Sequence, residues 1–86
     1  MIYEVRLSTR AERELNHLRG ETYLRLKSTI NELTTNARPP GCRKMVGHTN
    51  EWRIRLGPYR IVYTIDDATR QVRIRRVAHR RDAYRT

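Results

Sequence analysis

The sequence has little that would place it in a membrane, an oxidising compartment or a metal site. Its 86 residues include one cysteine, Cys42, which excludes an intrachain disulfide and a cysteine-based zinc site. The three histidines, at positions 17, 48 and 79, do not have metal-ligand spacing. No apolar run approaches the roughly 18 residues of a membrane span, and the first six residues lack the apolar core of a signal peptide. We therefore expect a cytoplasmic protein that uses no metal or other cofactor.

Acidic residues and lysine are also scarce, whereas arginine is abundant. Nine Asp and Glu oppose 19 Lys and Arg, which gives a formal net charge of +10, and only Lys27 and Lys44 are lysines. Residues 43–86 hold 12 of the cations and 4 of the acids. Because the guanidinium group binds phosphate through two parallel hydrogen bonds, this composition favours nucleic acid as the partner. An acidic protein partner and a merely solvated surface are the alternatives.

The N-terminal half predicts one strand and two helices. Residues 2–7 alternate between apolar and polar and predict a strand, after which Ser8 is a predicted helix N-cap. Gly20 is predicted to end the first helix at its C′ position. A second helix is predicted over residues 21–36, until Pro39-Pro40 prevents its continuation. Two helices joined by so short a link are expected to form an antiparallel hairpin.

From Arg43 onward a period of two predicts an antiparallel meander. Strands are expected at 43–46, 51–56, 59–65 and 71–78. The alternation of the last strand slips at Arg75-Arg76, which indicates a β-bulge. Residues 1–86 are therefore predicted to form one α+β domain: an N-terminal strand, a two-helix antiparallel hairpin and a mostly antiparallel β-meander, with the helices covering the apolar face of the sheet.

A predicted two-residue loop at Gly57-Pro58 sets the register of the central hairpin. It pairs Leu56 with Tyr59, Arg55 with Arg60, Ile54 with Ile61, Arg53 with Val62, and Trp52 with Tyr63. The apolar pairs then share one face and the three arginines share the other. Arg55 and Arg60 lie directly opposite each other, and like charges in such a pair are destabilising. We interpret the pair as an anion site; the alternative is that both side chains extend into water.

The C-terminal segment is predicted to reach the same basic face. His79 titrates near neutrality when unperturbed, and Tyr84 can stack on a base or transfer a proton. The alternatives are a strand-end cap for His79 and an apolar lid for Tyr84.

Several other polar residues are expected to have structural roles. Glu12, Glu14 and Glu21 are predicted to be solvated, and Asp66-Asp67 is predicted to be a turn rather than a metal pair. His48 is expected in an exposed loop, and Trp52 in the core beside Tyr63.

The segments 52–63 and 77–85 together resemble the RelE/ParE toxin superfamily, and RelE most of all. The shared pattern is Gly-x-Tyr-Arg followed by two apolar residues and Tyr in the hairpin, with His-Arg and a downstream Tyr after the last strand. The resemblance implies a type II toxin: a metal-independent endoribonuclease that cleaves mRNA in the A site of the 70S ribosome and pairs with a RelB-like antitoxin. A ParE-like poison of DNA gyrase, or a catalytically weak module that binds RNA or an antitoxin, are the alternative functions.

The resemblance also implies roles for individual residues. Arg60, Arg80 and Tyr84 match family positions, whereas Arg53 and Arg55 stand where the best-known members have lysines. Arginine binds and stabilises negative charge but does not transfer protons. The predicted catalytic residues are Arg60, Arg80, Tyr84 and His79, and the predicted RNA-binding residues are Arg53, Arg55, Lys44, Arg81 and Arg85.

Overall fold

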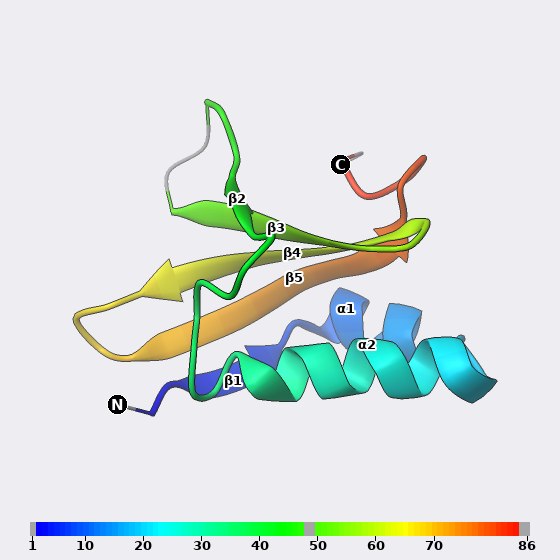
Figure 1. Ribbon diagram of the computed structural model, residues 1–86, viewed down its shortest axis with the longest axis horizontal. Coiled ribbons are helices and arrows are strands. Elements are labelled where there is room, and N and C mark those ends of the chain that lie inside the picture. Colours follow the sequence, from blue (N-terminus) through cyan, green and yellow to red (C-terminus); the bar gives the residue numbers. More distant parts are fainter. Residues whose placement is uncertain (1, 48–49, 85–86) are drawn as a thin grey trace.

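The computed structural model, which describes residues 2–47 and 50–84, is a five-stranded sheet with both helices on one face (Figure 1). The elements are β1 (Glu4–Leu7), α1 (Thr9–Asn16), α2 (Gly20–Glu32), β2 (Arg43–Lys44), β3 (Glu51–Leu56), β4 (Tyr59–Asp66) and β5 (Gln71–His79). The strand order is β1-β5-β4-β3-β2. Only the β1–β5 pair is parallel. The α+β class and the two-layer arrangement are confirmed.

The start of α1 agrees with the prediction, whereas the boundary between the two helices does not. Ser8 is the N-cap of α1, because its Oγ accepts from the amide of Ala11 at 3.0 Å. The expectation that Gly20 ends the first helix is wrong, because α1 ends at Asn16. The chain tightens after α1, where the amide of Leu18 donates to Leu15 O. Gly20, with φ of +64°, is instead the first residue of α2.

Three other elements are shorter than their patterns predict. In β1, the amide of Tyr3 donates to Thr34 O, outside the sheet, so pairing begins at Glu4. The second helix ends at Glu32 and passes through turns rather than continuing to residue 36. Strand β2 contains only Arg43 and Lys44.

The register of the central hairpin is confirmed at all five predicted pairs, from Trp52↔Tyr63 to Leu56↔Tyr59. The predicted bulge is also confirmed. Val62 pairs with Arg76 and Tyr63 with Ile74, so Arg75 is the extra residue of β5. Because one extra residue exchanges the two faces of a strand, this bulge determines which side chains of β5 reach which side of the sheet.

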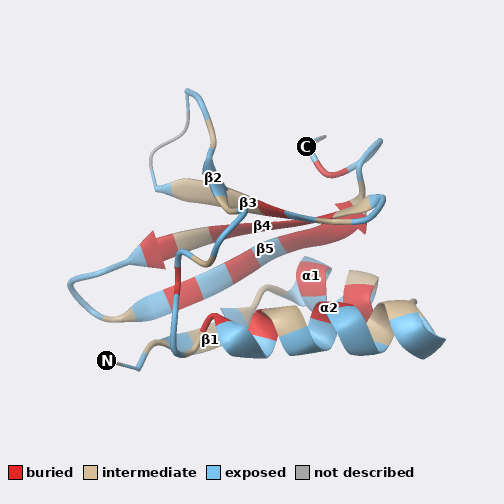
Figure 2. Cartoon of the chain, in the orientation of Figure 1, coloured by how far each residue is buried: buried red, intermediate tan, exposed pale blue. Residues whose placement is uncertain are grey.

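The core lies between the helices and the sheet (Figure 2). Its fully buried side chains include Leu26 and Leu33 from the helical half and Ile61, Tyr63 and Ile74 from the sheet. Trp52 packs against this cluster, as expected. A second, small cluster of Val62, Ala78 and Ala83, with Met45 beside it, lies on the other face of the sheet. The C-terminal segment therefore folds back over the face without helices.

The described residues contain neither a membrane-spanning helix nor a group of metal ligands. No helix within residues 2–47 and 50–84 is long and apolar enough to cross a membrane. In the same part of the chain, no three His, Cys, Asp or Glu side chains are grouped so that they could hold a metal ion.

Candidate functional site

Four arginines form two cross-strand pairs on the sheet face that has no helices, which we call the basic face. Arg55 pairs with Arg60 as predicted, and Arg43 pairs with Arg53. Directly opposed residues of an antiparallel pair extend their side chains to the same side. Sequence reasoning missed Arg43 and chose Lys44, which the register places opposite Trp52 instead. The basic face thus consists of Arg43, Arg53, Arg55 and Arg60, with two like-charge pairs.

Arg60 is held by the hairpin in which it lies. Its side chain is buried, and Nη1 donates to Gly57 O at 2.9 Å and to Tyr59 O at 2.8 Å. Gly57 occupies the left-handed region, with φ of +58°, which suits glycine at this loop position. Two carbonyl oxygens therefore orient the Arg60 guanidinium, whereas the Arg55 side chain is exposed to solvent.

The C-terminal segment reaches the basic face, as predicted. The amide of Arg80 donates to Pro58 O at 2.7 Å, and the amides of Asp82 and Ala83 both donate to His79 O. This turn brings the Tyr84 hydroxyl to 3.5 Å from Arg53 Nη1, at the long end of a hydrogen bond. Tyr84 is 48% exposed, so its ring and hydroxyl are accessible to a ligand on this face.

His79 lies on the opposite side of the sheet from Tyr84. It pairs with Tyr59, whose ring packs against the core, and the two ring centroids are 5.9 Å apart with an edge-on geometry. Its Nδ1 accepts from the amide of Arg81 at 3.2 Å, which places the proton of the neutral ring on Nε2. The structure therefore does not bring His79 together with the basic face. Arg80 and Arg81 are exposed, and Arg85 lies outside the described residues.

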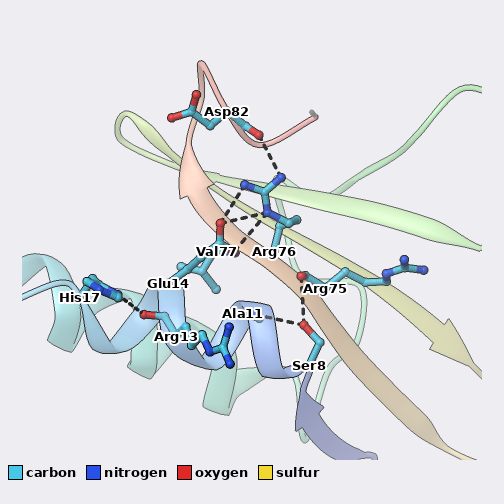
Figure 3. Close-up of polar contacts among 9 residues, drawn as sticks. All are labelled: Ser8, Ala11, Arg13, Glu14, His17, Arg75, Arg76, Val77 and Asp82. Carbon is cyan, nitrogen blue, oxygen red and sulfur yellow. Dashed lines mark hydrogen bonds and ion pairs between the residues drawn. The ribbon is translucent and has the colours of Figure 1, made fainter. Parts of the chain in front are cut away.

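A partly buried ion pair between Glu14 and Arg76 is the second feature that the sequence did not predict (Figure 3). The expectation that Glu14 is solvated is wrong, because its carboxylate accepts from Arg76 Nε and Nη2 and from the amide of Val77. Strand β1 ends at Leu7, so the carboxylate of α1 satisfies an amide that has no β1 partner. Glu12 and Glu21 are exposed, as predicted.

A third charged group lies at the turn between β4 and β5 and has a structural role. Asp67 accepts from Arg38 Nη1 and Nη2 and from the Tyr3 hydroxyl. These hydrogen bonds, from Arg38 first and Tyr3 second, lower the pKa of Asp67 to about 2, and the Arg38 pKa is raised in turn. Asp66 accepts from the amides of Ala68 and Thr69, so the predicted turn is confirmed.

Comparisons with known proteins assign the chain to a family. Residues 5–84 match the family described as the ParE toxin of the type II toxin–antitoxin system parDE. No curated protein sequence matches the chain.

Solved structures of RelE toxins have a similar fold. A chain of the toxin–antitoxin complex RelBE2 from Mycobacterium tuberculosis is 28% identical, with a TM-score of 0.80, and the match covers 93% of this chain and 100% of that one. A chain of the intact E. coli RelBE complex is 25% identical, with a TM-score of 0.78 and coverage of 90% and 95%. A chain of the RelE–RelB complex from Pyrococcus horikoshii OT3 is 24% identical, with a TM-score of 0.82 and coverage of 96% and 100%, and shows the likeness of fold alone.

Proposed function

The chain belongs to the RelE/ParE superfamily of type II toxins, and we propose that it is a RelE-like endoribonuclease that cleaves mRNA in the ribosomal A site. The observation that carries this proposal is the basic face with Tyr84 folded against it. Two like-charge pairs, Arg43–Arg53 and Arg55–Arg60, lie directly opposed across the strands, an arrangement that is destabilising in a sheet. The phosphodiester backbone of a bound RNA would remove that repulsion. Local features that reduce stability are concentrated at functional sites.

The proposed reaction needs charge stabilisation and proton transfer. The 2′-oxygen of the cut nucleotide gives its proton to water and attacks the adjacent phosphorus, the bond from phosphorus to the 5′-oxygen breaks, and the 5′-oxygen gains a proton, which leaves a 2′,3′-cyclic phosphate. Arg53, Arg55 and Arg80 bind the phosphates, and Arg60 presents a guanidinium that Gly57 O and Tyr59 O already orient. A donor fixed before the reaction stabilises developing charge without reorganisation.

Tyr84 is the proposed proton donor to the leaving 5′-oxygen. Its hydroxyl lies beside Arg53 Nη1, whereas the His79 ring lies on the other side of the sheet against Tyr59. The arginines of the face keep their protons and so supply only binding and charge. Because no strong base lies on this face among the proposed residues, the ribosome would orient the 2′-hydroxyl, and positioning alone lowers a barrier by several kcal/mol.

We also propose an antitoxin partner with an acidic segment. The solved complexes of RelE toxins contain their antitoxins, and a chain with a net charge of +10 favours a partner of opposite charge. The acidic segment would cover the basic face or displace the turn that carries Tyr84. A complex that leaves Arg53, Arg60 and Arg80 exposed to solvent, with this turn unmoved, would contradict direct occlusion.

A poison of DNA gyrase is the second candidate function, because the matched family is that of the ParE toxin. To distinguish the two functions, the chain is expressed in bacteria, mRNA 5′ ends are mapped, and translation and DNA breaks are followed. Cuts phased with codons that disappear in Tyr84→Phe and Arg53→Gln, but persist in the matched control Arg25→Gln on α2, are expected. Gyrase-dependent DNA breaks with intact mRNA would refute the nuclease proposal, and growth arrest with neither outcome would favour a binding module.

A further inference from the structure

The turn that carries Tyr84 is attached to the domain through Arg76. The guanidinium of Arg76 has two sides: Nη1 donates to Asp82 O at 3.0 Å, two residues before Tyr84, while Nε and Nη2 bind Glu14 (Figure 3). The turn is also attached by the amide of Arg80 on Pro58 O, by the contact of the Tyr84 hydroxyl with Arg53 Nη1 and by the packing of Ala83 in the small cluster. Arg76 is therefore the one side chain shown to bridge a helix and this turn among residues 2–47 and 50–84.

Glu14 fixes the orientation of that guanidinium. Its carboxylate accepts from Arg76 Nε at 3.0 and 3.1 Å and from Nη2 at 2.7 Å, so the planar group is held along one whole edge. The amide of Val77 donates to the same carboxylate at 3.0 Å, which fixes Glu14 against β5. The two side chains are only 21% and 10% exposed, so water competes weakly for these bonds.

We propose that Glu14 and Arg76 are positioning residues for Tyr84: Glu14, on a helix of the opposite layer, orients Arg76 on β5, and Arg76 holds the Tyr84 hydroxyl on the basic face. The carboxylate of α1 orients the guanidinium, the guanidinium binds the carbonyl of Asp82, and this carbonyl fixes the turn that ends at Tyr84. The contribution to catalysis rests on the proposed nuclease function, because it requires that Tyr84 transfers a proton. The structural part of the proposal, the position of Tyr84, does not depend on that function.

The position of Tyr84 can be measured without any assay of activity. The chain contains five tyrosines, so labelling with 3-fluorotyrosine gives five ¹⁹F NMR resonances, and Tyr84→Phe assigns one of them. In Glu14→Gln, the Tyr84 resonance is expected to move towards that of a solvent-exposed, mobile tyrosine. The resonance of the buried Tyr63 should stay in place, which shows that the core is intact.

Arg76→Lys is a second variant that keeps the positive charge next to Glu14. A lysine ammonium is a compact charge and cannot bridge the carboxylate and the Asp82 carbonyl as the forked guanidinium does. The Tyr84 resonance is expected to shift in the same direction, which keeps the test decisive where Glu14→Gln does not fold. Matched controls are Arg75→Lys on the adjacent exposed residue and Glu12→Gln on the exposed side of α1, and both should leave the resonance unchanged.

The catalytic part is tested by a double-mutant cycle on ribosome-bound mRNA. At saturating ribosomes, Glu14→Gln is expected to lower the cleavage rate by about 10- to 100-fold, since a displacement of about 1 Å has effects of this size. In a Tyr84→Phe background the same substitution should cause no further loss, because residues that act through one group are not additive.

The outcomes separate the two proposals. A Tyr84 resonance that does not move in a folded Glu14→Gln or Arg76→Lys protein refutes the positioning role. An equal loss of rate from Glu14→Gln with and without the Tyr84 hydroxyl refutes the catalytic coupling. If the unsubstituted chain does not cleave mRNA, the proposed function fails, while the resonance shifts still support the positioning role.

Discussion

Replacement of Arg55 by glutamine should make the protein more stable and weaken its binding to RNA. Arg55 lies directly opposite Arg60 in the β3–β4 pair and is exposed. Cross-strand charge pairs change stability by about 0.2–1 kcal/mol. Because the Arg60 guanidinium bonds to Gly57 O and Tyr59 O, we expect Arg55→Gln to add about 0.5 kcal/mol to the free energy of unfolding, at the middle of that range. In a domain of this size, that corresponds to a rise in Tm of about 2–4 °C.

The effect on RNA binding has the opposite sign. Each phosphate contact to a single strand contributes about 0.7 to the slope of log K against log salt concentration. Loss of the Arg55 contact should therefore reduce the slope by about 0.7 and the affinity by about fivefold at 0.1 M salt relative to 1 M salt. Arg25→Gln on α2 removes the same charge from the helical layer, and it should change neither the slope nor the Tm by a comparable amount.

Two assays measure these quantities: thermal unfolding at low and high salt, and titration of labelled single-stranded RNA across a salt series. The gain in Tm should shrink as salt increases, since salt screens exposed charges. A loss of stability in Arg55→Gln would show that repulsion between Arg55 and Arg60 does not destabilise the protein. An unchanged salt slope would show that the face does not bind phosphate through Arg55.

Three further predictions concern the framework of the domain. Asp67→Asn should lower the Tm at pH 5–7, and the difference from the unsubstituted protein should shrink as the pH falls from about 4 through 2. The folded pKa of Asp67 is about 2, below its ordinary value of 3.8, so its contribution is complete above the unfolded pKa and is lost as the pH falls through the folded one. A constant difference down to pH 2 would contradict this prediction. Tyr63→Phe leaves Ala37 O without the hydroxyl that donates to it at 2.9 Å, and it should cost about 1–3 kcal/mol in chemical denaturation; no loss would mean that water replaces this bond. Ser8→Ala removes the N-cap of α1 and should cost about 1 kcal/mol in the same assay, with Ser8→Thr close to neutral.

The central hairpin could be predicted from sequence because its information is local. A two-residue loop fixes the register, and the alternation of Trp52, Ile54 and Leu56 with arginines then fixes the faces. The same logic could not place Arg43. The connection from β2 to β3 is longer than a tight turn, so its length does not determine which residue faces Arg53.

The position of His79 depended on the bulge. With Arg75 as an extra residue, the end of β5 pairs His79 with Tyr59 and so directs it to the helical side. The sequence indicates that a bulge exists near Arg75-Arg76. The face that His79 reaches follows only once the extra residue and the pairing partner are both known, because a shift of one residue exchanges the faces.

The Glu14–Arg76 pair had no local signal. The two residues are 62 positions apart, and their contact depends on where α1 packs along the part of β5 that β1 does not cover. Glu14 lies at the flank of the apolar stripe of α1, directly before Leu15, a position that is usually solvated. Nothing in the sequence shows that an unpaired strand edge lies beside it.

The arrangement of charge links the stability of the domain to its ligands. Repulsion within the basic face lowers the free energy of unfolding of the isolated protein, whereas a bound polyanion both removes the repulsion and binds only the folded state. An acidic antitoxin segment and an RNA strand that use Arg53 and Arg55 would therefore each raise the Tm and exclude the other. Because arginine keeps its charge at all physiological pH values, this competition would depend on ionic strength far more than on pH. Arginine at these positions thus favours tight binding of phosphate or carboxylate. In the proposed mechanism proton transfer is left to Tyr84, and the proposed role of the ion pair between α1 and β5 is to position that residue.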